Sequence, residues 1–304
     1  GARARAARLR CGDATRSHAR SPQGGHLSTR IYVIPDTQIR PGDVTDHLDW
    51  IAQDIVRRKP DWLCVMGDWF DLPSLSSHDP PGSLAKEDAR LLADLEAGRA
   101  GFKQLVGPID AELERIARRR IKRWHLRREF FEGNHEWRAH RLFAADPRLE
   151  GVVGTHLCDV ENFGFRRHKF LEPFAIEGVH FAHYWQNALS SRPIGGTIDN
   201  RLNKLCCSFV CGHEQGLKYG NRPLPMGRTI HGIVAGSCYL GTEEYRGPQA
   251  RNEWRGVVVL NDVRDGDFEP MPLTLRYLCE EYTGEALPAY LRKRYPDRDW
   301  SHLD

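Results

Sequence analysis

The sequence predicts an α/β protein, because short apolar runs typical of strands alternate with polar segments of helical period. Segment 43–58, between the first and second runs, and segment 84–122, between the second and third, have the apolar spacing of helices. Several runs also end at a polar side chain of a kind that binds metal ions. The expected strands are 30–38, 61–71, 128–138, 179–185, 208–216, 229–240 and 255–262.

The first three runs end in the same way. RIYVIPDTQ is apolar up to Asp36, and DWLCVMGDWFD is apolar up to Asp68. The third run, REFFEGNHEWR, reaches Asn134 and His135 directly after a glycine. Glycine beside each of the second and third polar ends fits a turn in which the backbone approaches a ligand closely.

The later runs complete the pattern. VHFAHYW ends at His183, with His180 as the alternative histidine of that run, and SFVCGHEQG ends at His213. TIHGIVAGSCYL and RGVVVLND have no polar residue of this kind at a matching place, and we expect them to close the sheet. In α/β sheets the ligand lies outside the carboxyl ends of the strands, so the polar ends should share one edge.

Length and composition exclude several classes of protein. The chain has 304 residues, of which 40% are apolar and 28% charged, as is usual for a soluble globular protein with a sizeable core. No stretch approaches the roughly 20 apolar residues that span a membrane, and no apolar signal segment is present near residue 1. The eight cysteines form no CxxC pair, which favours reduced thiols in a cytoplasmic protein.

The charge is unevenly distributed along the chain. The net charge is +3, but residues 1–30 hold seven arginines and one aspartate. Residues 1–29 are also poor in large apolar side chains, so we expect a disordered basic tail. Such a tail could touch nucleic acid, but a solvated leader is the simpler interpretation.

The residues at the strand ends favour a metal site. Aspartate, asparagine and histidine together suit divalent ions such as Zn, Mn, Fe or Mg. An aspartate can bridge two ions with its two oxygens, and a pair of ions about 3.5–4 Å apart can hold a phosphoryl group and activate a water.

The order of these residues resembles the motifs of the calcineurin-like metallophosphoesterases, including phage and prophage members. The resemblance covers residues 31–262 and implies a two-sheet β-sandwich flanked by helices, an αββα arrangement. The matching residues are Asp36-Thr-Gln38, Gly67-Asp68-Trp-Phe-Asp71, Gly133-Asn134-His135-Glu136, His183 and Gly212-His213-Glu-Gln215.

The resemblance implies a site for two divalent metal ions that Asp68 bridges. Asn134, His183 and His213 would complete the second position, and Asp36 would hold the ion in the first position. Manganese is the favoured ion, with magnesium, iron and zinc as alternatives.

The resemblance also implies a proton donor. His135 would not bind metal but would face the phosphate as general acid for the leaving oxygen. Asp71 would pair with this histidine, fix its tautomer and raise its basicity.

Two residues depart from the family pattern, which usually has histidine where this chain has Gln38 and Gln215. Both belong to the first metal position. An amide oxygen is a harder and weaker donor than an imidazole nitrogen, so the substitutions favour Mn or Mg over Zn and predict lower affinity. The alternative is that the first position is empty and the glutamines only form hydrogen bonds.

Two further residues are candidate substrate contacts. Arg138 could bind a phosphate oxygen through its planar pair of donors, and His78 follows the second motif closely. The simpler interpretations are a salt bridge on a helix surface for Arg138 and an ordinary surface histidine for His78.

A dense basic run, residues 115–128, precedes the GNHE motif. It holds eight basic residues and Trp124, and we expect it to lie near the site and to contact a nucleic-acid backbone. The alternative is a solvated helix face, which is the usual role of such a run.

These observations predict a metal-dependent phosphoesterase that hydrolyses phosphate mono- or diesters through a metal-activated water. The segment GDWFDLP lacks the arginine of the phosphoprotein-phosphatase motif GDxVDRG, so a nucleotide or nucleic acid is the favoured substrate and nuclease activity is included. The alternatives are a phosphoprotein phosphatase and a non-catalytic scaffold with a degenerate first metal position. The pairing of His135 with Asp71 argues against the scaffold.

The resemblance also sets the expected boundaries. Residues 30–265 would form the metallophosphoesterase domain, and residues 266–304 would be a C-terminal extension packed on it. We expect a cytoplasmic location, in a host cytoplasm if a phage encodes the chain, and no contact with a membrane.

Overall fold

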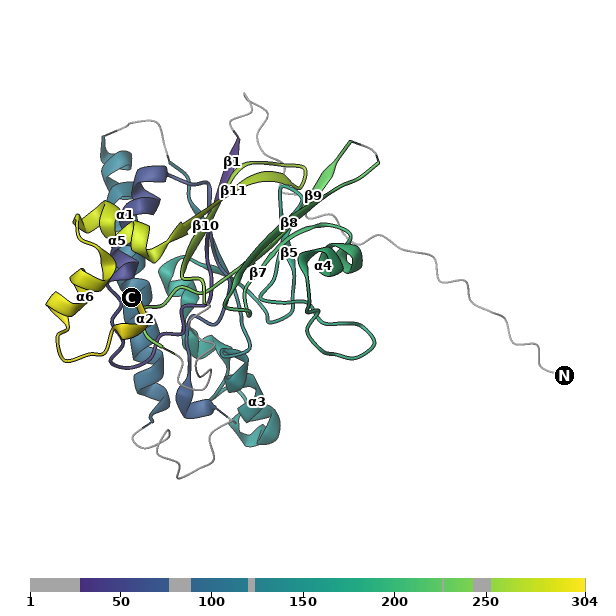
Figure 1. The fold of residues 1–304 in the computed structure, drawn as a ribbon. Coiled ribbons are helices and arrows are strands. Elements are labelled where there is room, and N and C mark those ends of the chain that lie inside the picture. The colour runs from purple at the N-terminus through teal and green to yellow at the C-terminus, as the bar shows by residue number, and fades with distance from the viewer. Residues whose placement is uncertain (1–27, 77–88, 120–123, 226, 243–252, 304) are drawn as a thin grey trace.

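The computed structural model describes residues 28–76, 89–119, 124–225, 227–242 and 253–303. Two β-sheets pack face to face, and helices cover both outer faces, which confirms the expected α/β sandwich (Figure 1). The first sheet has the order β11-β10-β1-β2-β3-β4, and the second has the order β5-β6-β7-β9-β8.

Strands β1, β2, β3 and β4 are parallel, and β10 and β11 add antiparallel strands at one side. In the second sheet β6, β7 and β9 are parallel and β5 and β8 are antiparallel edge strands. The strands are β1 (Thr29–Ile34), β2 (Trp62–Val65), β3 (Arg127–Phe131), β4 (Arg166–His168), β5 (Phe174–Ile176), β6 (Val179–Phe181), β7 (Ser208–Cys211), β8 (Leu217–Pro223), β9 (Thr229–Ala235), β10 (Gly256–Arg264) and β11 (Asp267–Thr274).

Helices α1, α2, α5 and α6 pack on the outer face of the first sheet, and α4 packs on the outer face of the second. Helix α3 follows β3 directly and lies beside the loops that end the parallel strands (Figure 1). The helices are α1 (His47–Arg58), α2 (Leu91–Arg118), α3 (Trp137–Ala145), α4 (Ile198–Leu205), α5 (Leu275–Thr283) and α6 (Leu287–Arg294). Short 3-10 helices are η1 (Pro73–Leu75), η3 (Pro147–Leu149), η4 (Thr155–Cys158), η5 (Val160–Phe163) and η7 (Ser301–Leu303).

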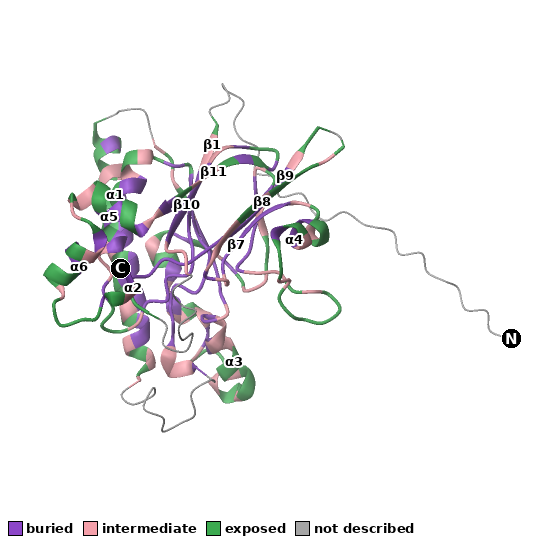
Figure 2. Cartoon of the chain, in the orientation of Figure 1, coloured by how far each residue is buried: buried purple, intermediate pink, exposed green. Residues whose placement is uncertain are grey.

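The continuous apolar character of β1 explains its central place. Because successive side chains of a strand point to opposite faces, Tyr32 and Ile34 pack under the helices while Ile31 and Val33 pack between the sheets. Both faces of the strand are therefore buried, as is typical of a parallel strand covered on two sides. Figure 2 shows the buried strands inside the shell of half-exposed helices.

The two runs expected to close one sheet belong to different sheets. TIHGIVAGSCYL forms β9 in the second sheet, whereas RGVVVLND forms β10 in the first. Strands β4, β5, β8 and β11 were not expected from the sequence, because they are three residues long or contain several polar residues or prolines. The two helices expected from residues 43 and 84 begin later in the structure, α1 at His47 and α2 at Leu91.

The C-terminal segment is part of the layered fold. Strand β11 pairs with β10 along its length, and helices α5 and α6 contribute Leu278 and Leu291 to the core under the helices. The expected boundary between residues 265 and 266 falls in the turn that joins β10 to β11. The expected tail, residues 1–29, lies outside the described residues except for its last two.

Within the described part of the chain, no helix combines the length and the apolar character needed to cross a membrane.

A pair of glycines lets the turns after β2 and β3 pack against each other. Gly67 has φ +88°, and a Cβ there would lie 2.6 Å from both Gly133 N and Phe131 O. Replacement by alanine would therefore force backbone atoms apart and would also place a side chain in the left-handed region.

We expect Gly67→Ala to lower the free energy of unfolding by about 2–4 kcal/mol, because backbone atoms cannot move aside as a flexible side chain can. Gly241→Ala is the matched control, since its φ is not in the left-handed region and no atom lies within 4 Å of the added Cβ. Urea unfolding monitored by circular dichroism measures both variants. Equal stability of the two would show that the Gly67 turn tolerates a side chain.

Candidate metal centre and catalytic site

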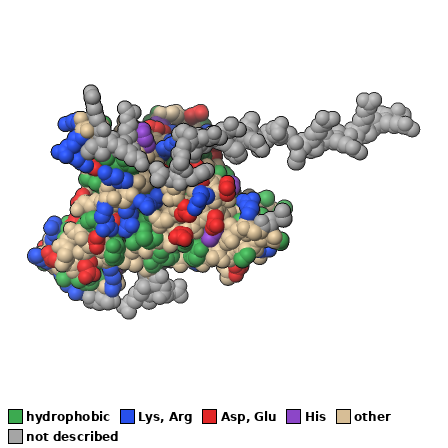
Figure 3. Space-filling view, turned by 90° about the horizontal axis from the view of Figure 1, so that it is seen from above, with side chains coloured by type: hydrophobic (Ala, Val, Ile, Leu, Met, Phe, Trp, Pro, Cys, Tyr) green, Lys and Arg blue, Asp and Glu red, His purple; other side chains and the backbone are tan. Residues whose placement is uncertain are grey.

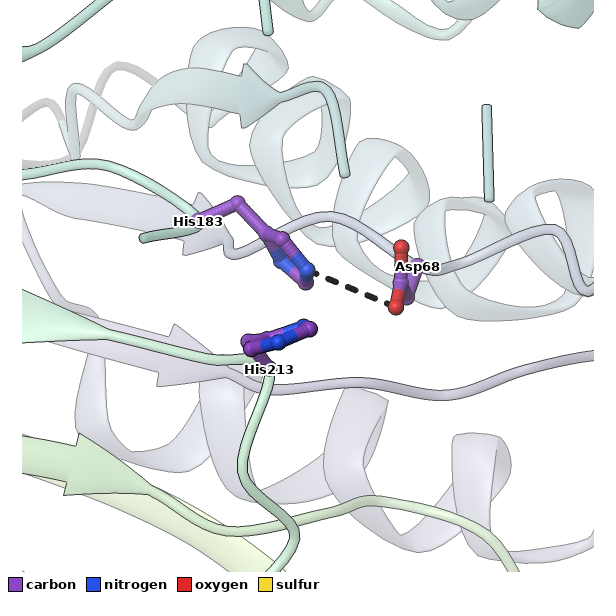
Figure 4. Close-up of side chains that lie close together, drawn as sticks. All are labelled: Asp68, His183 and His213. Carbon is purple, nitrogen blue, oxygen red and sulfur yellow. Dashed lines mark ion pairs between the residues drawn. The ribbon is translucent and has the colours of Figure 1, made fainter. Parts of the chain in front are cut away.

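The polar residues at the strand ends converge where the two sheets meet. Asp68 follows β2 and Asn134 follows β3 in the first sheet, whereas His183 follows β6 and His213 follows β7 in the second. Each residue leaves the carboxyl end of a parallel strand, so all of them lie at one edge of the sandwich. Figure 4 shows Asp68, His183 and His213 pointing toward one another from both sides.

The distances within this cluster are those of ligands around one ion. His183 Nε2 lies 3.4 Å from Asp68 Oδ2 and 3.0 Å from Asn134 Oδ1. His213 Nδ1 lies 2.9 Å from the same Asn134 oxygen. Donor atoms of Asp68, His183 and His213 all lie within 4.8 Å of one another. Ligands at about 2.1 Å from one ion are separated by roughly 3.0–3.4 Å, so the cluster fits a divalent cation.

The tautomer of His183 adds to this fit. Its Nδ1 lies 2.7 Å from the carbonyl oxygen of Met66, which can only accept, so Nδ1 carries a proton and donates it. In the neutral ring the lone pair on Nε2 then points at the oxygens of Asn134 and Asp68. In the metal-free protein a proton on Nε2 satisfies these oxygens, as the raised pKa of His183 indicates, and a metal ion would replace that proton.

Asp36 lies at the edge of the cluster with an unsatisfied oxygen. Its Oδ1 accepts a hydrogen bond of 3.1 Å from the backbone N–H of His213, but its Oδ2 is buried without a hydrogen-bond partner. Burial raises the pKa of this carboxyl group to about 7. A buried carboxylate oxygen without a partner is costly unless a cation or proton neutralises it, which again fits a metal position.

Opposite charges stabilise one another within the cluster and shift the pKa values of its members. Burial alone would raise the pKa of Asp68, but His135 and His183 outweigh it and lower that pKa below its usual value. Burial alone would lower the pKa of His183, and the charge of Asp68 reverses the direction and raises it. Burial, together with the neighbouring His183, lowers the pKa of His213 to about 4, so this ring is neutral and available as a ligand.

The two glutamines of the first metal position are hydrogen-bonded to each other. Gln215 Nε2 donates to Gln38 Oε1 at 3.2 Å, and the Tyr239 hydroxyl lies 2.5 Å from Gln215 Oε1. The same hydroxyl lies 2.8 Å from Glu253 Oε2, and Arg255 lies over the tyrosine ring. Both amides are engaged by protein partners, so these residues fit a metal ion less well than the cluster around Asp68 does.

His135 lies beside the cluster and is held by Asp71. Its Nδ1 is 2.7 Å from Asp71 Oδ1, and its Nε2 is 3.7 Å from Asp68 Oδ2. Burial opposes a charge on this ring, but the carboxylates of Asp68 and Asp71 outweigh it, and the pKa of His135 is raised. The ring thus presents Nε2 toward the cluster while Asp71 fixes the other nitrogen.

Two arginines hold Asp71 in turn. Arg138 donates at 2.6 Å to the backbone carbonyl of Asp71, and its Nη2 lies 3.0 Å from His135 Nε2. Arg40 Nε lies 2.5 Å from Asp71 Oδ2. Arg138 Nη1 also lies 3.7 Å from Asp71 Oδ1, and its side chain is only 10% exposed, so its ion pair is buried beside the site rather than on a helix surface.

Glu136 is a positioning residue that sequence reasoning missed. Its buried carboxylate accepts the backbone N–H groups of Asp68, Phe70 and Gly133 at 2.8–3.0 Å. It therefore ties the turn after β2 to the turn after β3. The sequence signal was its place in GNHE, but no pattern in the sequence shows which backbone groups a buried glutamate will accept. Tyr239 and Arg40 were missed for the same reason.

The backbone at the site is strained. Gln38, Asp68 and His213 have φ values of 48°, 47° and 70°, in the left-handed region. Each such residue costs about 1–3 kcal/mol and persists only where surrounding contacts enforce it. Strain at three of the candidate ligands indicates that the fold places these side chains at the expense of stability.

The remaining predicted residues lie elsewhere. His78 lies outside the described residues, and His180 lines a cavity with Phe174 and His231 rather than the cluster around Asp68.

The basic run 115–128 ends where β3 begins, whereas Asn134 and His135 follow the other end of β3. The described part of the run is therefore not beside the site, because the two ends of a parallel strand lie at opposite edges. Arg115 and Arg118 are paired with glutamates of α2.

Figure 3 looks onto the top of Figure 1, where the β8–β9 and β10–β11 hairpins lie, and shows basic and acidic side chains interspersed on that face.

Comparisons with known proteins find distant structural similarity. No protein-family model and no curated protein matches the chain. Among solved structures, the chain is similar to TT1561 of Thermus thermophilus, with 10% identity, 81% of this chain and 99% of that chain covered, and a TM-score of 0.30. It is also similar to a dimetal phosphatase from Danio rerio, with 11% identity, coverage of 82% and 99%, and a TM-score of 0.34. At these values a likeness does not establish a function.

We expect His213→Ala to weaken binding of Mn²⁺ by more than about 100-fold, because it removes a neutral imidazole from the cluster. His231→Ala is the matched control, since this strand histidine pairs with Asp267 far from Asp68. Calorimetric titration of metal-free protein measures both. If the two variants bind Mn²⁺ alike, His213 is not a ligand.

Proposed function

We propose that the protein is a metal-dependent phosphoesterase acting on a nucleotide or nucleic-acid phosphoester. The observation that carries the proposal is the convergence of Asp68, Asn134, His183 and His213 beside an imidazole that Asp71 holds. A cluster of candidate metal ligands by itself would also fit an ion with a purely structural role. An adjacent histidine with one nitrogen fixed by a carboxylate and the other directed at the cluster is what a hydrolytic reaction requires.

A divalent cation held by the cluster would supply a Lewis acid that polarises the phosphoryl group and lowers the pKa of water. The protein residues have separate tasks. Asp71 orients the His135 ring, so Nε2 is the atom that would transfer a proton to the leaving oxygen. Arg138 holds Asp71 in place by donating to its backbone carbonyl. Its Nη2 lies 3.0 Å from His135 Nε2 and can only donate, so it would turn to a bound phosphate oxygen when Nε2 carries the proton that is transferred.

The metal positions are unequal in this proposal. Asp68, Asn134, His183 and His213 provide a compact set of donors, whereas Gln38 and Gln215 are bonded to each other. We therefore infer that the second position, around Asp68, binds an ion strongly and that the first position, next to Asp36, binds one weakly. Mn²⁺ is the favoured ion because the atoms available at the first position are oxygens.

We expect the Mn²⁺-loaded protein to hydrolyse aryl phosphate esters and to lose this activity when a chelator removes the metal. His135→Asn should lower kcat by about 10²–10⁴ while leaving Mn²⁺ affinity unchanged, because it removes a proton donor and no metal ligand. Turnover is followed by release of nitrophenolate and metal binding by calorimetry.

His231→Asn is the control and should keep full activity. If His135→Asn keeps full activity, the histidine has no role in proton transfer. If the metal-loaded parent has no activity on mono- or diesters, the phosphoesterase proposal fails and the scaffold alternative gains support.

We expect the double variant Gln38→His with Gln215→His to bind a second metal ion more tightly than the parent and to prefer Zn²⁺ over Mn²⁺, because imidazole is a softer donor than an amide. Either single variant should change less, since the remaining amide still limits the position. Metal content after dialysis gives the number of ions per chain. If the double variant holds no more metal than the parent, these residues do not line a metal position.

A further inference from the structure

A row of aromatic rings leads away from the metal cluster. Consecutive ring centroids lie 5.3 Å apart for Tyr184 and Phe170, 5.4 Å for Phe170 and Trp137, 3.7 Å for Trp137 and His140, and 4.4 Å for His140 and Phe143. The rings come from α3, from the loop after β4 and from the loop after β6. The members of this aromatic row are Tyr184, Phe170, Trp137, His140 and Phe143.

The aromatic row is not part of the hydrophobic core. The buried clusters under the helices, between the sheets and under α4 include none of these rings, either as buried members or as partly buried neighbours. Each ring is neither fully buried nor fully exposed. Large rings that pack on one another outside a core, with part of their surface in water, are typical of a binding surface.

The row begins at the candidate ligands. The Tyr184 ring lies 4.7 Å from the His213 ring and 5.7 Å from the His183 ring. Trp137 is the first residue of α3 and follows Glu136, whose carboxylate fixes the turns that carry Asp68 and Gly133. The position of the row relative to the cluster is therefore set by the same turns that set the cluster.

The charge along the row suits an anionic ligand. Helix α3 has the sequence WRAHRLFAA, which includes Arg138 and Arg141 and no acidic residue. A flat ring joined to a phosphate would meet aromatic faces along the row and positive charge beside it.

We propose that the aromatic row binds the nucleobase of the substrate, so that the protein favours nucleoside phosphoesters over alkyl phosphoesters. This inference rests on the proposed phosphoesterase function and names the substrate class of the same site. A phosphate at the cluster would place the attached nucleoside against Tyr184 and then Phe170 and Trp137. Stacking is sequence-tolerant because every base has an aromatic face, so a preference among bases is not required.

The test compares two ligands that differ only in the base. Calorimetry with the full Mn²⁺-loaded protein measures the affinity for AMP and for ribose 5-phosphate, which share the sugar and the phosphate. We expect AMP to bind at least about tenfold more tightly, the scale of one base stacked on an aromatic side chain. Trp137→Leu and, separately, Phe170→Leu should reduce that ratio several-fold while leaving the affinity for ribose 5-phosphate unchanged.

Tyr277→Leu is the matched control, because this ring is 41% exposed on α5 and does not belong to the row. It should leave the ratio unchanged. If the parent hydrolyses aryl phosphates yet binds AMP and ribose 5-phosphate equally, the inference is overturned and the phosphoesterase proposal stands. A ratio that both row variants retain also overturns it. If neither ligand binds and no ester is hydrolysed, both proposals fall together.

Discussion

The buried carboxylate of Glu136 is the interaction on which the site depends. It accepts three backbone N–H groups, one from Gly133 and two from the turn that carries Asp68, so it joins the ends of β2 and β3. Asp68 in turn accepts a hydrogen bond of 2.9 Å from the backbone N–H of His135. Charged groups that accept several backbone donors in a buried place hold geometry far more rigidly than contacts between side chains on a surface. The separation between Asp68 and His135 is therefore fixed before any ligand arrives.

The second constraint is the junction of two sheets. Each sheet alone would bring together only half of the polar residues, with Asp68 and Asn134 on one and His183 and His213 on the other. The apolar layer between the sheets brings the two halves into contact, and it is built from Val33, Phe131, Phe181, Val210 and Ile233 among others. Core packing thus brings carboxylate, amide and imidazole groups from both sheets close enough to share one cation.

The structure also separates the two halves of the candidate centre. One half, around Asp68, consists of ligand atoms directed at one another, such as His183 Nε2 and Asn134 Oδ1 at 3.0 Å. The other half is occupied by the bonded amides of Gln38 and Gln215 and by the Tyr239 hydroxyl. This difference is physical, because ligand atoms directed at a common point can share one cation, whereas an amide that already has a hydrogen-bond partner gains little from one.

The sequence by itself determined the class of the fold and the strand ends that carry polar residues, because apolar periodicity and glycine placement are local properties of the chain. The expectation of an α/β sandwich is confirmed, and the strand ends at Asp68, Asn134, His183 and His213 lie together, although their roles remain predictions. Only the tertiary structure decided which sheets β9 and β10 join and that Glu136 connects the turns after β2 and β3. It also decided that Gln215 accepts a hydrogen bond from Tyr239, and that the basic run leads into the start of β3, at the edge of the sheet away from His135. These facts depend on contacts between segments far apart in the chain, and no local pattern specifies which buried donor a given acceptor will meet.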